Sequence, residues 1–249
     1  MTRRVLQVTG ADREKFLQGL VSNDVRRAAQ DKDGIIHTAL LTPQGKYLAD
    51  FFIIGRADAL LIDASADQAA ALAKRLSMYR LRADVQIADT DLVVSRGTGD
   101  APAGALPDPR HPALGWRLYG DTDLSDTTDW DAIRVAHLIP ETGIELTPES
   151  YILENGFERL HGVDFRKGCY VGQEVTARMK HKTELRKGLM QVQIKGEAPV
   201  GTPITMEDGR EAGVLYTRSG EHAIAWLRFD RATAPLRAGD AEITALPQE

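Results

Sequence analysis

The sequence contains one cysteine, Cys169, among 249 residues. A single thiol excludes a disulfide within the chain and survives best in a reducing compartment. No stretch is long and apolar enough for a membrane span, and the start of the chain lacks the apolar run of a secretory signal. We therefore expect a globular protein of the cytoplasm with no membrane partner.

Several sequence patterns of catalysis and metal binding are also absent. The chain has no G-x-x-x-x-G-K-[ST], no G-x-G-x-x-G after a strand and no G-x-S-x-G, so nucleotide-phosphate and serine-hydrolase functions lose their usual support. The six histidines are scattered without i, i+4 pairs, and a cubane iron-sulfur cluster takes several cysteine thiolates. We expect no permanently bound metal, and one cysteine cannot hold a stable cluster alone.

Net positive charge is concentrated around the cysteine, whereas acidic residues outnumber basic ones over the rest of the chain. The net charge is −5, which argues against a general attraction to nucleic acid or to an anionic membrane. Residues 166–187 hold seven basic and two acidic side chains, a local charge of +5. Within this segment, the basic run from Arg178 to Lys187 predicts a site for folate's glutamate tail, for an acidic partner or for RNA, and a solvated helix face is the alternative.

Hydrophobic periodicity predicts an α+β fold in three parts. Residues 1–96 contain strand-like runs at Ile35 to Leu41 and Tyr47 to Ile54, joined by a Pro- and Gly-containing turn. A Gly- and Pro-rich stretch, 97–115, predicts a loop or linker without regular elements and marks a boundary. Residues 97–186 are expected to contain helices at 129–138, 147–154 and 173–182. Short alternating runs predict a small β barrel over 187–249.

The densest motif is the octapeptide KGCYVGQE, residues 167–174. A thiol among basic residues and just before a helix N-terminus should have its thiolate favoured, which makes Cys169 reactive or able to bind a ligand. The alternative is a small buried packing residue. The octapeptide consists of Lys167, Gly168, Cys169, Tyr170, Val171, Gly172, Gln173 and Glu174.

This octapeptide resembles the signature of folate-binding proteins that assist iron-sulfur cluster assembly, sometimes called tRNA-modifying because a client enzyme modifies tRNA. Further blocks in the same order support the resemblance: residues 16–24, 41–50, 153–155 and 162–165. The resemblance implies the fold of the glycine-cleavage aminomethyltransferases, with three modules around a central folate channel. It also implies tetrahydrofolate or a derivative as ligand, and iron-sulfur client or assembly proteins as partners.

The resemblance assigns further residues to the folate site. Asp50 matches the carboxylate that assists folate chemistry in the transferase, but Ala49 stands where the transferase pattern has a second aspartate. Glu154 can accept two hydrogen bonds from a pterin edge, although an exposed helix glutamate is the alternative. The predicted folate contacts are Asn23, Asp50, Glu154, Asn155 and Arg178, and Asn23 followed by Asp24 is also an ordinary turn pair.

Three functions remain open from the sequence. The first is a folate-binding accessory protein for cluster assembly or repair that acts through Cys169. The second is a folate-dependent aminomethyl or methyl transferase in which Asp50 does the polar work and Cys169 is structural. The third is direct RNA binding, which rests only on the basic run.

Overall fold

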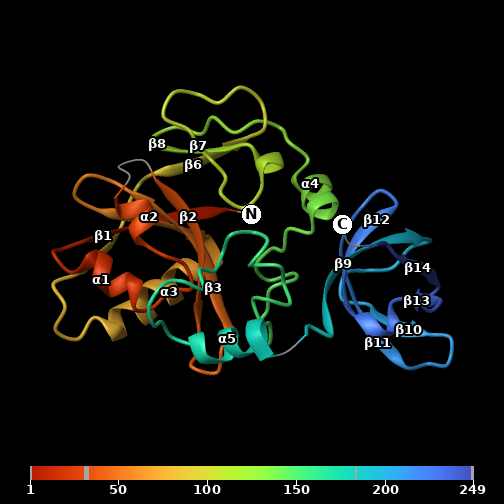
Figure 1. The fold of residues 1–249 in the computed structure, drawn as a ribbon. Coiled ribbons are helices and arrows are strands. Elements are labelled where there is room, and N and C mark those ends of the chain that lie inside the picture. The colour runs from red at the N-terminus through yellow and green to blue at the C-terminus, as the bar shows by residue number, and fades with distance from the viewer. Residues whose placement is uncertain (1, 31–33, 183, 248–249) are drawn as a thin grey trace. The chain divides into compact units, whose positions relative to one another are not determined.

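The computed structural model describes residues 2–30, 34–182 and 184–247 (Figure 1). Contacts within the chain group it into two units. Unit 1 comprises residues 1–128 and 157–175, and unit 2 comprises residues 129–156 and 176–249. The division by residue number into 1–96, 97–186 and 187–249 stays a prediction.

Unit 1 is built on a five-stranded antiparallel sheet with the order β2-β3-β4-β1-β5. The hairpin predicted from the sequence is confirmed, with Ala39 opposite Asp50 in its register. The described elements of the first 89 residues are β1 (Arg3–Thr9), α1 (Arg13–Gln18), α2 (Arg26–Ala29), β2 (Ile35–Leu41), β3 (Tyr47–Gly55), β4 (Leu60–Ser65), α3 (Ala66–Tyr79) and β5 (Gln86–Asp89).

Both faces of this sheet are buried. Phe51 and Ile53 of β3 lie in a core that also contains buried side chains of α1, α2 and α3. Phe52 and Ile54, which point to the opposite face because strand side chains alternate, lie in a second cluster with Leu106. This double burial explains why β3 is apolar almost throughout instead of alternating.

A three-stranded sheet, β6-β8-β7, supplies residues to the second cluster. Its strands are β6 (Val93–Gly97), β7 (Leu106–Pro107) and β8 (Trp116–Gly120), and a short 3-10 helix, η1 (Pro112–Leu114), precedes β8. The stretch 97–115, expected to be irregular, therefore contains a strand and a helical turn.

A buried ion network ties β8 to the five-stranded sheet. Arg117 of β8 donates to Asp63 of β4 at 2.5 Å and to Asp108 at 3.2 Å, and all three side chains are at most 2% exposed. Arg3 of β1 also donates to Asp63, at 2.6 Å. Burial alone would raise the pKa of Asp63, but the charges of Arg117 and Arg3 outweigh it and hold the pKa below its ordinary value.

Unit 2 contains a helix, a run of turns and a closed six-stranded barrel with the order β10-β11-β12-β9-β14-β13. Small and branched side chains such as Ala225 and Leu227 fill the barrel core. The elements are α4 (Trp130–His137), β9 (Lys187–Lys195), β10 (Pro203–Met206), β11 (Glu211–Ser219), β12 (His222–Arg228), η2 (Phe229–Arg231), β13 (Leu236–Ala238) and β14 (Ala241–Ala245).

The predicted helix over 173–182 is confirmed as α5 (Gln173–Lys182), which begins in unit 1 and continues in unit 2. The predicted helix over 147–154 is wrong. Residues 147–156 form successive turns closed by i→i+3 hydrogen bonds, among them Asn155 N to Ile152 O at 3.2 Å and Gly156 N to Leu153 O at 3.2 Å. Burial of Ile152 and Leu153 overrides the local helical pattern. No helix in the described part of the chain combines the length and the apolar character needed to cross a membrane.

The buried network generates a stability prediction. Replacing Arg117 with Met should lower the free energy of unfolding by about 3 kcal/mol, because Asp63 keeps its burial but loses a partner. Urea denaturation at pH 7 measures the change. The exposed pair Arg4 and Asp89, at 2.8 Å, provides the control: Arg4→Met should cost less than about 1 kcal/mol.

The same variant has an expected pH dependence. A carboxyl whose folded pKa is lowered stabilises the fold above its unfolded pKa of about 4 and loses that effect below it. The difference between parent and Arg117→Met should therefore shrink as the pH falls below about 4. Equal losses for Arg117→Met and Arg4→Met at pH 7 would contradict this role of the network.

Candidate functional site

The cysteine segment begins with a turn set by Asp164. One oxygen of this carboxylate accepts the backbone N–H groups of Arg166 and Lys167, at 2.7 and 3.2 Å. The other oxygen pairs with Arg27 at 2.5 Å, and Asp164 N donates to Ser22 O at 3.0 Å. The turn is thereby fixed to the part of unit 1 that follows α1.

Lys167 anchors the segment from within unit 1. Its side chain is buried, and its ammonium group donates to the backbone carbonyls of Gln18, Val21 and Asn23, two of them at 2.8 and 2.9 Å. Burial lowers its pKa to about 8, against the opposing effect of the Asp24 and Asp164 carboxylates. The positive charge of Lys167, which we expected to favour the Cys169 thiolate, is therefore directed at main-chain carbonyls instead.

Cys169 lies exposed, next to exposed Gly168. On the other side Tyr170 is buried, with its ring centre 5.0 Å from the Lys167 ammonium. Within the octapeptide, the side chains of Lys167 and Tyr170 are therefore buried in unit 1, whereas the Cys169 thiol between them faces solvent. The alternative in which Cys169 is a buried packing residue is wrong.

Gly172 closes the segment against the β2–β3 hairpin turn. Its φ is +83°, and a Cβ at this position would lie 2.6 Å from Thr42 O. Gly45 of the turn has φ +75°, and a Cβ there would lie 2.9 Å from the Cβ of Val175. Only glycine allows this approach. Gln173, half-buried, and Glu174, exposed, then begin α5.

Asp50 is held inside unit 1 by two side chains. Its Oδ1 accepts the Tyr47 hydroxyl at 2.7 Å, and its Oδ2 lies 3.1 Å from Nε2 of His37. His37 is itself buried between Phe52 and Phe157, with ring centres 5.4 and 4.9 Å away. Nδ1 of His37 is buried and has no hydrogen-bond partner among the described residues. Both oxygens of the predicted folate carboxylate therefore have contacts within the protein.

Sequence reasoning did not identify His37 and Tyr47. The hairpin register contained a signal for His37: Ala39 lies opposite Asp50, so His37, two residues away on the same strand, is on the same face as Asp50. Tyr47 lies on the strand of Asp50, three residues before it. Its hydroxyl also accepts the N–H of Asp50 at 3.1 Å. This contact depends on the conformation of the Tyr47 side chain, which the sequence pattern does not show.

Asn23 ties distant segments together. Its amide donates to His37 O and to His161 O, both at 2.7 Å, and its Oδ1 accepts the N–H of Asp24 at 2.8 Å. The Arg26 side chain, together with other hydrogen bonds, lowers the pKa of Asp24 to about 2 against the effect of burial. Both hydrogen bonds that the Asn23 side-chain amide donates thus go to main-chain carbonyls. A folate contact of Asn23 stays a prediction.

Unit 2 contains the remaining predicted folate residues. Glu154 is 9% exposed, and its Oε1 lies 3.8 Å from Nζ of Lys187. Asn155 is 1% exposed and donates to Tyr151 O at 2.9 Å, while its Oδ1 is buried without a hydrogen-bond partner among the described residues. Two adjacent residues thus carry acceptor oxygens of low exposure.

Arg178 is exposed on α5. Binding of folate's tail, an acidic partner or RNA by the basic run stays a prediction. Within residues 2–30, 34–182 and 184–247, no three His, Cys, Asp or Glu side chains converge as a metal site.

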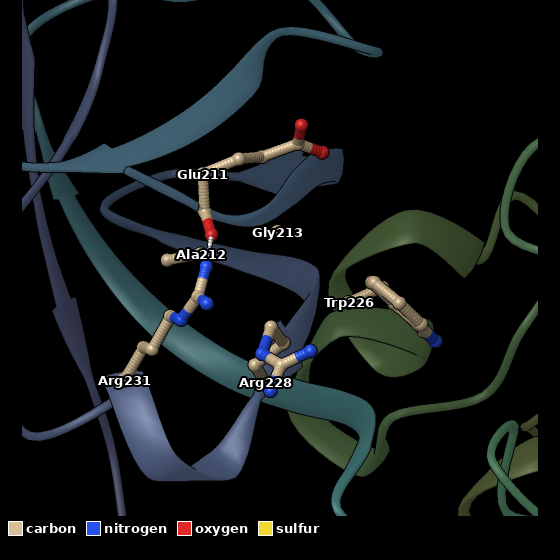
Figure 2. A pocket seen from close by; sticks show the side chains of 6 residues that line it. All are labelled: Glu211, Ala212, Gly213, Trp226, Arg228 and Arg231. Carbon is tan, nitrogen blue, oxygen red and sulfur yellow. Dashed lines mark hydrogen bonds between the residues drawn. The ribbon is translucent and has the colours of Figure 1, made fainter. Parts of the chain in front are cut away.

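The barrel has a surface hollow of about 200 Å³. Figure 2 shows Trp226, Arg228, Arg231 and Glu211 arranged around Gly213. Arg231 donates to the backbone carbonyl of Glu211, and Arg228 pairs with Asp230 at 3.3 Å. Both guanidinium groups thus have contacts within unit 2, and none of the predicted site residues lines the hollow.

The anchoring of the cysteine segment gives a second prediction. Lys167→Met keeps the length of the side chain but leaves three carbonyls without their donor, which should lower the free energy of unfolding by about 3 kcal/mol. It should also free the segment, so that trypsin cleaves faster after exposed Arg166. Lys195→Met, at a side chain that is 85% exposed, should change neither quantity. Unchanged stability and cleavage in Lys167→Met would refute the anchor.

Three comparisons relate this chain to known proteins. A family model described as the CAF17 C-terminal β-barrel domain matches residues 186–249. The fold is similar to that of the glycine cleavage system aminomethyltransferase T from Bartonella henselae, with a TM-score of 0.76, 12% identity, and coverage of 99% of this chain and 83% of that one. The aminomethyltransferase-like α+β fold and the C-terminal barrel are thus confirmed. At this identity the likeness shows the fold alone, and a central folate channel stays a prediction.

The sequence relatives are iron-sulfur cluster assembly factors. The IBA57 homolog of Neurospora crassa is 32% identical over 76% of this chain and 51% of its own length. That of Phaeosphaeria nodorum is 30% identical over 93% of this chain and 70% of its own length. Mouse IBA57 is 29% identical over 96% and 79%. The aligned region spans only about half the length of some relatives, including 54% of the Mycosarcoma maydis protein.

These relatives are named mitochondrial, which contradicts the cytoplasmic location expected from the sequence. That expectation rested on one free cysteine, and a free thiol is compatible with any reducing compartment. The identity to the Phaeosphaeria nodorum protein over most of both chains, together with the matching barrel domain, shows that this chain belongs to the IBA57/CAF17 family of iron-sulfur cluster assembly factors.

Proposed function

We propose that this protein supports the assembly or repair of iron-sulfur clusters in client proteins and that Cys169 is the residue that contacts the cluster. The observation that carries this proposal is the exposed thiol on a segment fixed on both sides, by Lys167 and by Tyr170. A reactive group that faces solvent from a fixed backbone suits contact with another macromolecule. The names of the relatives support the same process.

One thiolate limits what this chain can do. A [2Fe–2S] or [4Fe–4S] cluster is usually held by four cysteine thiolates. Cys169 can supply one sulfur, after the thiol has lost its proton, and the remaining ligands must come from a partner. The cluster is therefore cargo that is shared at a protein–protein contact, not a resident cofactor.

We also propose that tetrahydrofolate or a derivative binds this protein. The chemistry of unit 2 suits the pterin edge, which presents neighbouring N–H donors. Glu154 offers a carboxylate, and Asn155 offers a buried acceptor oxygen that has no hydrogen-bond partner among the described residues. Glu154 and Asn155 would hold the pterin. Tetrahydrofolate, when bound, supplies a carrier for one-carbon groups.

The transferase function is the second candidate, because the fold is that of an aminomethyltransferase. The contacts of Asp50 favour the accessory role. Tyr47 and His37 engage both of its oxygens, whereas a carboxylate that acts on substrate needs an oxygen directed at the reacting atoms. Production of methylene-tetrahydrofolate from an aminomethylated lipoyl donor by the purified protein would reverse this preference.

The role of Cys169 gives a third prediction. Cys169→Ser should melt within about 2 °C of the parent, because an exposed thiol contributes little to stability, yet it should fail to restore cluster-dependent enzymes in a strain that lacks the protein. Folate binding by the variant should be unchanged. The matched control, Ser125→Cys introduced into Cys169→Ser, offers an exposed thiol elsewhere and should not restore activity. Full rescue by Cys169→Ser would overturn the cluster role.

Folate binding gives a fourth prediction. A ligand at a hundredfold excess over its Kd stabilises the native state by about 2.7 kcal/mol, so tetrahydrofolate should raise the melting temperature. Glu154→Gln should reduce this shift, since a neutral amide accepts weaker hydrogen bonds than a carboxylate. Glu242→Gln, at a side chain that is 61% exposed, should keep the full shift. Absence of any shift at millimolar tetrahydrofolate or 5-formyl-tetrahydrofolate would remove folate from the proposal.

A further inference from the structure

The C-terminal end of α3 presents an apolar surface that unit 1 does not use. Met78, Tyr79 and Leu81 are 70%, 37% and 91% exposed. Among the described residues only two other large apolar side chains are exposed to this degree, Leu124 and Val200. Three of the five therefore lie within four positions. Isolated exposed apolar side chains are common, whereas a cluster of them requires an explanation.

The packing of α3 does not require these side chains. Ala69, Leu72 and Leu76 bury the other face of the helix in the main core of unit 1. These core residues fix the helix, which Figure 1 labels α3. The exposed end is therefore presented from a rigid element, and its side chains can be changed without entering the core.

Leu81 occupies a backbone position that disfavours leucine. It follows the C-cap residue Arg80 and has φ +41°, in the left-handed region. Glycine or asparagine is the usual residue where a helix ends in this conformation. Leucine here carries a backbone cost, and its side chain is 91% exposed. The stability of this chain gives no reason for leucine at position 81.

The apolar side chains are surrounded by positive charge. Residues 74–82 contain four basic side chains and no acidic one, in a chain of net charge −5. All four are exposed: Lys74, Arg75, Arg80 and Arg82. The acidic residue nearest in sequence, Asp84, accepts the N–H of Ala11 at 3.1 Å and donates its own N–H to the Asp12 carboxylate at 2.9 Å. We call residues 74–82 the α3 tip.

We propose that the α3 tip is a docking surface for an acidic protein that carries an apolar patch. Charge complementarity defines the occupant: the basic rim pairs with carboxylates while Met78 and Leu81 enter apolar contacts. Arginine, tyrosine and methionine are enriched at protein interfaces, and the tip contains three arginines. A membrane-bound helix would instead use a whole apolar face, and the apolar face of α3 is buried in the core.

This inference concerns a second surface and does not rest on the role of Cys169 or on folate. The variant Leu81→Gly separates docking from structure. Glycine suits the left-handed backbone, so a purely structural tip predicts an equal or higher melting temperature with no loss of binding. The docking role predicts the same melting result with a loss of binding.

The probe is a synthetic helical peptide of 20 residues, with leucines along one face and glutamates elsewhere, followed by fluorescence anisotropy with the full chain. We expect micromolar binding that weakens about tenfold in Leu81→Gly and again in Arg80→Glu/Arg82→Glu. Higher salt should weaken it in the parent. The control Leu124→Gly/Arg210→Glu changes a leucine that is 54% exposed and an arginine whose side chain is 61% exposed, both outside the tip, and should bind as the parent does.

Three results would overturn the proposal. The first is absent peptide binding, or binding that is equal in parent, tip variants and control. The second is binding of phosphatidylglycerol vesicles, instead of the peptide, that the tip variants abolish, which would make a membrane the occupant. The third is concentration-dependent self-association in sedimentation that the tip variants abolish, which would make a second copy of this chain the occupant.

Discussion

The ammonium group of Lys167 is the contact on which the placement of the cysteine depends. The main chain from the end of α1 toward β2 presents the carbonyls of Gln18, Val21 and Asn23, and Lys167 donates to all three. A buried carbonyl without a donor is costly. The segment that carries Cys169 therefore cannot leave unit 1 without exposing or orphaning these groups, and the thiol is presented from a fixed base.

Buried charge plays a comparable part in each unit. Asp63 and Arg117 join the two sheets of unit 1. In unit 2, Arg134 of α4 donates to buried Glu145 at 2.5 Å, and Glu145 accepts the Thr217 hydroxyl of β11 at 2.6 Å. Buried pairs add little net stability relative to apolar packing, but a broken pair is expensive. Their effect is to make one arrangement of irregular segments much more favourable than the alternatives.

The likeness to an aminomethyltransferase concerns the fold alone. The fold matches with a TM-score of 0.76 at 12% identity, so the framework is kept while most side chains differ. In this chain the carboxylate of Asp50 contacts His37 and Tyr47, and the exposed thiol of Cys169 lies on another segment. Function resides in such sites and not in the fold itself.

The sequence by itself determined the elements whose signals are local: the β2–β3 hairpin with its turn glycine, the helix that starts at Gln173, and the barrel strands. It also determined that Cys169 is the one thiol and, through the octapeptide, the family. Only the tertiary structure decided that Lys167 points at the carbonyls of residues 18–23 while Cys169 faces solvent, that Asn23 is used by the main chain, and that residues 147–156 form turns. These outcomes depend on partners up to 149 residues away in the chain, and a local pattern of residues contains no information about which distant groups need a hydrogen-bond donor.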